Sequence, residues 1–83
     1  MNREELENIL EKEGVIKRAY SLYGLVGDDD RLILDRGQDK WEVYYFERGE
    51  KIKLNIFETE DEACNHFLNR ILKWPELKRR ASQ

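Results

Sequence analysis

The chain has 83 residues, of which 40% are hydrophobic and 40% charged, and this length predicts a single domain, residues 1–83, with one small core. No apolar run approaches the ~20 residues that a membrane-spanning helix needs, so the sequence excludes such a helix. The formal net charge of −3 at pH 7 argues against a protein that binds the phosphate backbone of nucleic acids, whose affinity depends on Lys and Arg.

The first predicted element is a helix that begins after Asn2. Asn2 and Glu5 have the spacing of a capping box, in which each side chain accepts a hydrogen bond from the backbone of the other residue. Leu6, Ile9 and Leu10 then lie on one stripe of the helix. Gly14 ends it, because glycine readily adopts the backbone conformation that follows a helix.

Two strands are predicted next, separated by an acidic turn. The segment Val15–Val26 is rich in tyrosine and leucine, and Arg31–Arg36 forms the second strand. The turn between them contains Asp28, Asp29 and Asp30, residue types that favour turns. These carboxylates are either a solvated turn or a cluster that attracts a basic partner protein. A calcium loop spreads its ligands over about twelve residues, so no metal site is predicted here.

Residues 40–57 are predicted to form the third and fourth strands, which separate at Gly49. A turn of two or four residues at Gly49 pairs residues whose numbers have an odd sum. In this register the aliphatic residues of the fourth strand share one face of the sheet with every second residue of the third strand, starting at Trp41. The predicted core face therefore carries Trp41, Val43, Tyr45, Ile52, Leu54 and Ile56. A turn at Gly37-Gln38 likewise predicts that Leu34 pairs with Trp41.

The opposite face of these strands is predicted to carry Glu42, Tyr44, Phe46 and Arg48 beside lysines. Two short helices cover one face of a four-stranded sheet but not both, so Tyr44 and Phe46 are expected to face solvent. Rigid aromatic side chains surrounded by charge are typical of protein-binding surfaces. The alternative is ordinary cross-strand packing of aromatic rings on lysine side chains.

A second helix is predicted after Thr59, which has the spacing of a capping residue with Glu62. It ends at Trp74-Pro75, because the residue before a proline resists helical geometry. The sequence therefore predicts an α+β fold in the order α-β-β-β-β-α. In this fold a four-stranded antiparallel meander has the N- and C-terminal helices packed on one face.

The sequence carries no pattern that predicts catalysis. Cys64 and His66 are two positions apart on the predicted helix and therefore point in divergent directions, which disfavours both a metal site and a nucleophilic pair. Cys64 is expected in the core and His66 on the surface. We expect a protein that is not an enzyme and uses no cofactor. The single cysteine, which cannot form an internal disulfide, and the lack of a signal peptide favour a cytoplasmic location.

Three segments of the sequence resemble a family of small bacterial immunity proteins from polymorphic-toxin systems. These are residues 41–49, which read WEVYYFERG, residues 57–64, which read FETEDEAC, and residues 19–24, which read AYSLYG. The resemblance covers about residues 15–72.

The resemblance implies a protein that binds a cognate toxin domain and blocks its activity, as a monomer or weak dimer. It leaves open whether the toxin is a nuclease, an NAD-consuming enzyme or an ADP-ribosylating enzyme. The sites expected to contact a partner are the acidic turn and the second face of the sheet. The alternative is a small regulatory protein-interaction domain or a binder of single-stranded nucleic acid, in which Tyr44 and Phe46 would stack on bases; the acidic balance makes nucleic acid the weaker choice.

Overall fold

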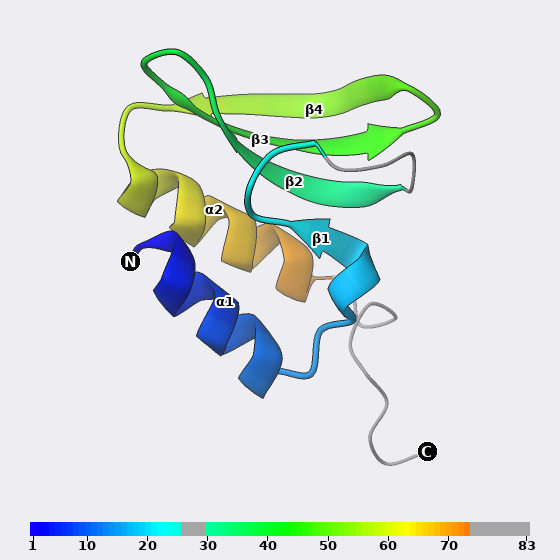
Figure 1. Ribbon diagram of the computed structural model, residues 1–83, viewed down its shortest axis with the longest axis vertical. Coiled ribbons are helices and arrows are strands. Elements are labelled where there is room, and N and C mark those ends of the chain that lie inside the picture. Colours follow the sequence, from blue (N-terminus) through cyan, green and yellow to red (C-terminus); the bar gives the residue numbers. More distant parts are fainter. Residues whose placement is uncertain (26–29, 74–83) are drawn as a thin grey trace.

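In the computed structural model, which describes residues 1–25 and 30–73, two helices cover one face of a four-stranded sheet (Figure 1). The elements are α1 (Arg3–Lys12), the 3-10 helix η1 (Lys17–Ala19), β1 (Tyr20–Ser21), β2 (Arg31–Arg36), β3 (Trp41–Glu47), β4 (Glu50–Phe57) and α2 (Glu60–Leu72). The predicted α+β class and the order α-β-β-β-β-α are confirmed. The predicted helix end at Trp74-Pro75 lies outside the described residues.

Helix α1 begins and ends as its sequence predicts. The Asn2 side chain accepts a hydrogen bond from the Glu5 amide, the Glu5 carboxylate accepts one from the Asn2 amide, and each distance is 2.9 Å. At the other end Gly14 has a φ of +76°, and the amide of Val15 donates to the Leu10 carbonyl at 3.0 Å. This is a Schellman ending, in which glycine takes the left-handed position.

Strand β1 differs from the prediction, because it is short and runs parallel to β2. Tyr20 pairs with Leu32 and Ser21 with Ile33, so the sheet is mixed rather than wholly antiparallel. After Ser21 the chain turns at Gly24, whose φ of +92° interrupts the strand-like run of large side chains. The Gly24 amide still donates to the Leu34 carbonyl at 3.0 Å. Most of the acidic turn predicted between these strands, including Asp28 and Asp29, lies outside the described residues.

The hairpin of β2 and β3 has the predicted faces but a shifted register. Leu34 pairs with Val43, and Trp41 pairs with Arg36 instead of Leu34. The Gly37 amide donates to the Lys40 carbonyl at 2.7 Å, so the turn is centred one residue later than predicted. A shift of two residues in pairing keeps every side chain on its original face, and Trp41 and Val43 therefore remain in the core.

The hairpin of β3 and β4 contains a β-bulge that the sequence did not reveal. The turn at Arg48 and Gly49 has two residues with positive φ, 51° and 80°, as in a type I′ turn. Tyr45 then pairs with Ile52 as predicted, but beyond the bulge Val43 pairs with Asn55. Toward the end of β4, Glu42 pairs with Ile56 and Trp41 pairs with Phe57.

The residue that makes this bulge is Lys53, whose φ is 54°. One extra residue in β4 reverses the direction of every later side chain relative to β3. The prediction that Leu54 and Ile56 share the core face with Trp41 is therefore wrong, and Phe57 packs against the core instead.

The core lies between the helices and the adjoining face of the sheet. It includes buried residues of α1, such as Leu6, of β2 and β3, such as Val43, and of α2, such as Phe67. The ring of Tyr20 meets that of Phe67 edge-on, with 6.4 Å between the centroids. Side chains of this size dominate the burial of apolar surface in a domain this small.

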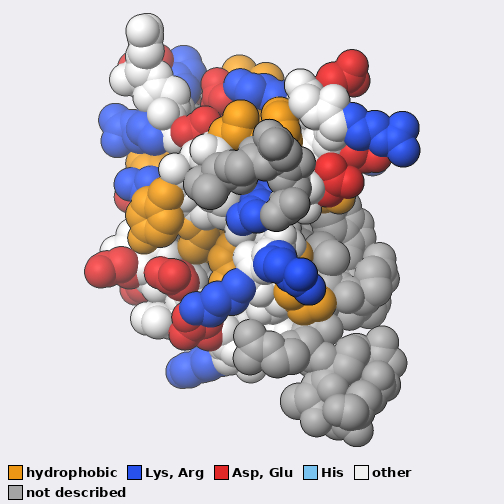
Figure 2. Space-filling model, turned by 45° about the vertical axis from the view of Figure 1, so that its right-hand side comes forward, with side chains coloured by type: hydrophobic (Ala, Val, Ile, Leu, Met, Phe, Trp, Pro, Cys, Tyr) orange, Lys and Arg blue, Asp and Glu red, His pale blue; other side chains and the backbone are white. Residues whose placement is uncertain are grey.

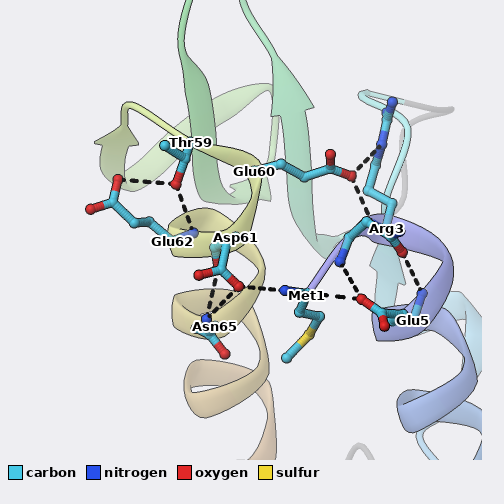
Figure 3. Close-up of polar contacts among 9 residues, drawn as sticks. Met1, Arg3, Glu5, Thr59, Glu60, Asp61, Glu62 and Asn65 are labelled. Atoms are coloured by element: carbon cyan, nitrogen blue, oxygen red, sulfur yellow. Dashed lines mark hydrogen bonds and ion pairs between the residues drawn. The ribbon is translucent and has the colours of Figure 1, made fainter.

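The first turns of the two helices lie side by side (Figure 3). The Glu60 carboxylate accepts a hydrogen bond from the Arg3 amide at 2.8 Å, and the Met1 ammonium donates to the Asp61 carboxylate. Thr59 accepts a hydrogen bond from the Glu62 amide at 3.1 Å, which confirms the predicted cap. The Glu62 carboxylate accepts a hydrogen bond from the Thr59 hydroxyl at 3.3 Å, and not from the Thr59 backbone amide as in a full capping box. These carboxylates offset the positive ends of both helix dipoles.

Arg3 connects the helices with the sheet and the start of the β1–β2 connection. Its guanidinium carbon lies 4.7 Å from the ring centroid of Tyr23 and 5.0 Å from that of Trp41. Arg36 lies over the same tryptophan at 5.0 Å. Trp41 is 6% exposed, as predicted for a core position, and its ring is enclosed by two cations that attract its π-system.

Candidate protein-binding face

The face of the sheet turned away from α1 and α2 is called the outer face below. Alternation along the strands, together with the observed pairs, assigns its residues. They are Arg31, Ile33, Asp35, Glu42, Tyr44, Phe46, Lys51, Leu54 and Ile56. Ile33 and Tyr44 are buried yet do not belong to the core cluster beneath the helices, which agrees with this assignment.

Tyr44 was expected to face solvent, and this expectation is wrong because the side chain is only 1% exposed. Its hydroxyl donates to the Asp35 carboxylate at 3.3 Å, and the Lys51 ammonium lies 4.8 Å from its ring centroid. The chain at Gly24 lies close by, since a Cβ added there would stand 3.1 Å from the Asp35 carboxylate. Burial, assisted by the Asp35 charge, raises the pKa of Tyr44 to about 12.

The polar part of the outer face is an ordered charge pair beside partly buried aromatic residues. Lys51 and Glu42 approach to 3.7 Å, and their side chains are about half and a quarter exposed respectively. Lys51 pairs across the strands with Phe46, which is half-buried. Exposed ion pairs of this kind add at most about 1 kcal/mol to stability, so their main effect is to fix the direction of the side chains.

The most exposed hydrophobic residues of this face are the two that the sequence assigned to the core. Leu54 is 43% exposed and Ile56 is 56% exposed. They stand two positions apart on β4, so both project from the same face. The sequence gives little sign of this, because the left-handed position that reverses the strand is filled by Lys53 rather than by glycine or asparagine.

The other predicted contact residues lie at one end of the sheet or outside the described residues. Arg48 is exposed in the β3–β4 turn, and Asp30 is exposed immediately before β2. Because Arg31 pairs with Phe46, Asp30 and Arg48 belong to the same end of the sheet. Asp28 and Asp29 lie outside the described residues. The structure thus places Glu42, Tyr44 and Phe46 on one face of β3, with the buried Tyr44 between the other two in the strand, and leaves Arg48 and Asp30 at the margin.

The acidic residues around the start of α2 have partners within the chain. Glu58 pairs with Lys40, Glu60 with Arg3, and Asp61 with the Met1 ammonium. Hydrogen bonding to that ammonium lowers the pKa of Asp61. The acidic residues here therefore cap the helix and pair with local charges.

Cys64 and His66 do not form a reactive pair. Cys64 is fully buried, and burial raises the pKa of its thiol to about 11, which leaves it protonated and unreactive at neutral pH. The His66 ring was expected on the surface but packs on Phe57, with 5.0 Å between ring centroids, and its Nε2 atom is buried. Burial, with smaller contributions from Arg70 and Lys73, lowers the pKa of His66.

A shallow hollow of about 200 Å³ lies beside β1, between side chains of α1, η1 and the start of β2. Its lining is Glu7, Lys17, Tyr20, Ser21, Leu22, Tyr23 and Arg31. Ligand pockets usually enclose roughly 300–1,000 Å³, so the hollow is small for an organic cofactor. Within residues 1–25 and 30–73, no three His, Cys, Asp or Glu side chains gather as metal ligands. In the same part of the chain no helix has the length and apolar character to cross a membrane.

The outer face is therefore the strongest candidate site, because it combines exposed apolar residues with oriented charges on a hydrogen-bonded sheet. Comparison of the chain with protein-family models, curated proteins and solved structures gave no match.

Proposed function

We propose that this protein is a non-enzymatic immunity protein that binds a cognate bacterial toxin domain through the outer face of its sheet. The observation that carries the proposal is the exposed pair Leu54 and Ile56, 43% and 56% accessible, on a strand whose backbone is held in place by pairing with β3. Apolar side chains that are already ordered before binding lose little conformational entropy in a complex. The oriented pair of Glu42 and Lys51 beside them supplies a polar margin.

The resemblance to immunity proteins provides the biological class of the partner. The residues that carry the resemblance mostly form the fold: Trp41, Val43 and Cys64 are buried, and Arg48 with Gly49 makes the hairpin turn. They support a shared architecture, whereas Leu54 and Ile56 lie outside the matching segments. Variation at such surface positions is what separates a cognate toxin from others.

A binding role also agrees with the acid–base properties of the described side chains. The two groups whose pKa values shift furthest, Tyr44 and Cys64, are buried and shifted toward the protonated form. A cysteine nucleophile or a tyrosine base needs the opposite shift and access to a substrate. Neither residue has these properties.

The structure weakens the nucleic-acid alternative, which depended on Tyr44 and Phe46 as stacking platforms. A base cannot stack on Tyr44, because that ring is 1% exposed with Lys51 above it. On the side of the molecule shown in Figure 2, acidic, basic and hydrophobic side chains of the described residues are intermixed, whereas binding to a nucleic-acid backbone rests on Lys and Arg.

The direct test is co-expression with a toxin domain encoded immediately upstream of this chain's gene. We expect growth rescue and a complex that co-elutes, and we expect the double variant Leu54→Ser with Ile56→Ser to lose both. The matched control is Leu25→Ser, which changes another half-exposed leucine that does not belong to β4. Absence of both rescue and complex with the unaltered protein would refute the immunity function. Normal binding by the double variant would instead move the contact away from β4.

A salt-dependent shift of a labelled single-stranded oligonucleotide at micromolar protein would favour the alternative function. Immunity binding predicts no such shift. The two functions therefore give opposite results in one gel experiment performed on the same preparation.

A further inference from the structure

The outer edge of β4 is divided into a protected half and an unprotected half. β4 is the last strand of the sheet and pairs only with β3 among the described strands (Figure 1). In its first half, the bulge at Lys53 interrupts the strand, and the Arg70 guanidinium donates to the Lys53 carbonyl at 3.0 Å. Lysines, bulges and covering side chains are the usual protections against edge pairing.

The second half, Leu54–Phe57, has none of these protections. Its residues alternate in a regular strand after the bulge, and no described side chain donates to their backbone carbonyls. Leu54 and Ile56 leave it apolar on the outer face. A sheet edge of this composition favours pairing with another strand.

We propose that the second half of β4 pairs antiparallel with the same segment of a second copy of this chain, about a two-fold axis through Asn55. This inference does not depend on the proposed function, since it concerns a second copy and not a toxin. In this register Leu54 faces Ile56 of the partner copy, and Ile56 faces the partner's Leu54. A two-fold axis perpendicular to the sheet keeps both outer faces on the same side. Four apolar side chains then form one cluster at the centre of a continuous sheet.

The charges at the two ends of β4 are complementary in the same arrangement. The start of the strand carries Glu50, Lys51 and Lys53, which leaves it basic on balance. Lys51 pairs with Glu42 at 3.7 Å, whereas Lys53 has no carboxylate within ion-pair distance in the described part of the chain. The end leads into Glu58 and the acidic first turn of α2, and Glu58 is 73% exposed at its side chain. Antiparallel pairing brings the basic start of each copy toward the acidic end of the other. A parallel arrangement would place like charges together.

The first test is the oligomeric state of the full chain in sedimentation velocity from micromolar concentration to about 1 mM. We expect a reversible dimer that weakens as salt is added. Ile56→Lys should weaken dimerisation at least about tenfold, because it places an ammonium against the partner's Leu54. Leu25→Lys, the control at a half-exposed leucine outside β4, should dimerise normally. A wild-type chain that stays monomeric throughout the range, or a dimer indifferent to Ile56→Lys, overturns the proposal.

The second test fixes the register and does not require Ile56→Lys to fold. Asn55 would lie opposite itself, where Cα atoms are about 4.5–5.5 Å apart and a disulfide fits. Asn55→Cys should therefore cross-link on mild oxidation. Lys53→Cys should not, because Lys53 would face Phe57 of the other copy and its own counterpart would be about 13 Å away. Cys64 gives no background, since it is fully buried. Equal cross-linking of the two variants refutes the register.

Discussion

The bulge at Lys53 predicts that one substitution will stabilise the protein where the same substitution two residues earlier destabilises it. Lys53 has a φ of 54°, a left-handed conformation that disfavours an L-residue by roughly 1–2 kcal/mol. Glycine adopts this conformation without strain. It also raises the conformational entropy of the unfolded chain, which cancels about 0.5–1 kcal/mol of that gain in stability. The Lys53 side chain is exposed, and its structural hydrogen bond with Arg70 uses only the carbonyl. Lys53→Gly should therefore raise the free energy of unfolding by about 0.5–1 kcal/mol.

Lys51→Gly is the matched control, because Lys51 is an ordinary strand residue with negative φ. Glycine there weakens the strand by about 1 kcal/mol, in addition to the lost contacts with Glu42 and Tyr44. In thermal melts followed by circular dichroism, the Lys53 variant should melt about 2–8 °C higher than wild type and the Lys51 variant at least about 4 °C lower. If both variants melt lower by the same amount, Lys53 is not left-handed, and the assignment of Leu54 and Ile56 to the outer face fails with it.

Three further predictions concern buried aromatic and imidazole groups. Trp41→Ala should lower the free energy of unfolding by about 3–5 kcal/mol, against less than about 1 kcal/mol for the half-buried Phe46→Tyr, as measured by urea denaturation. Tyr44→Phe removes a hydrogen bond to Asp35 worth about 0.5–1.5 kcal/mol. It should also remove the phenol that ionises near pH 12 in absorbance titrations. Because folding raises the pKa of Tyr44, the contribution of this residue to the free energy of unfolding is full below about pH 10 and declines as the pH rises from there toward 12. Burial lowers the pKa of His66, so stability should be full above about pH 6.5 and fall as pH drops through the lower folded value. His66→Gln should flatten that part of the stability–pH curve, and an unchanged slope would place the titration elsewhere.

Much of the fold follows from local signals in the sequence. The Asn2 and Thr59 caps, the glycine after α1 and the turn at Gly49 each act over a few residues, and each is found where its pattern predicts. The face of Trp41 was also predictable, because strand alternation survives a shift of two residues in register.

What the sequence did not predict depends on positions where the local signal is missing or misleading. Lys53 occupies a left-handed position with no turn-forming side chain, and this single residue exchanged the environments of Leu54 and Phe57. Tyr44 was assigned to solvent by counting helices, but Asp35 and Lys51 enclose it from neighbouring strands. Both errors concern contacts between strands, which composition and periodicity do not encode. The contact surface predicted from the sequence was consequently centred on a ring that is buried.

The docking of α1 against the start of α2 divides the folding of this small domain into two stages. β2, β3, β4 and α2 succeed one another in the chain and contact their sequence neighbours, so they form with low contact order. α1 instead docks through pairs such as Arg3 and Glu60, which are 57 positions apart, and its loop must close before that contact forms. We therefore expect amides of α1 to exchange hydrogen through a partial opening that leaves β3 protected. The N-terminal helix is then the last element to assemble and the first to detach.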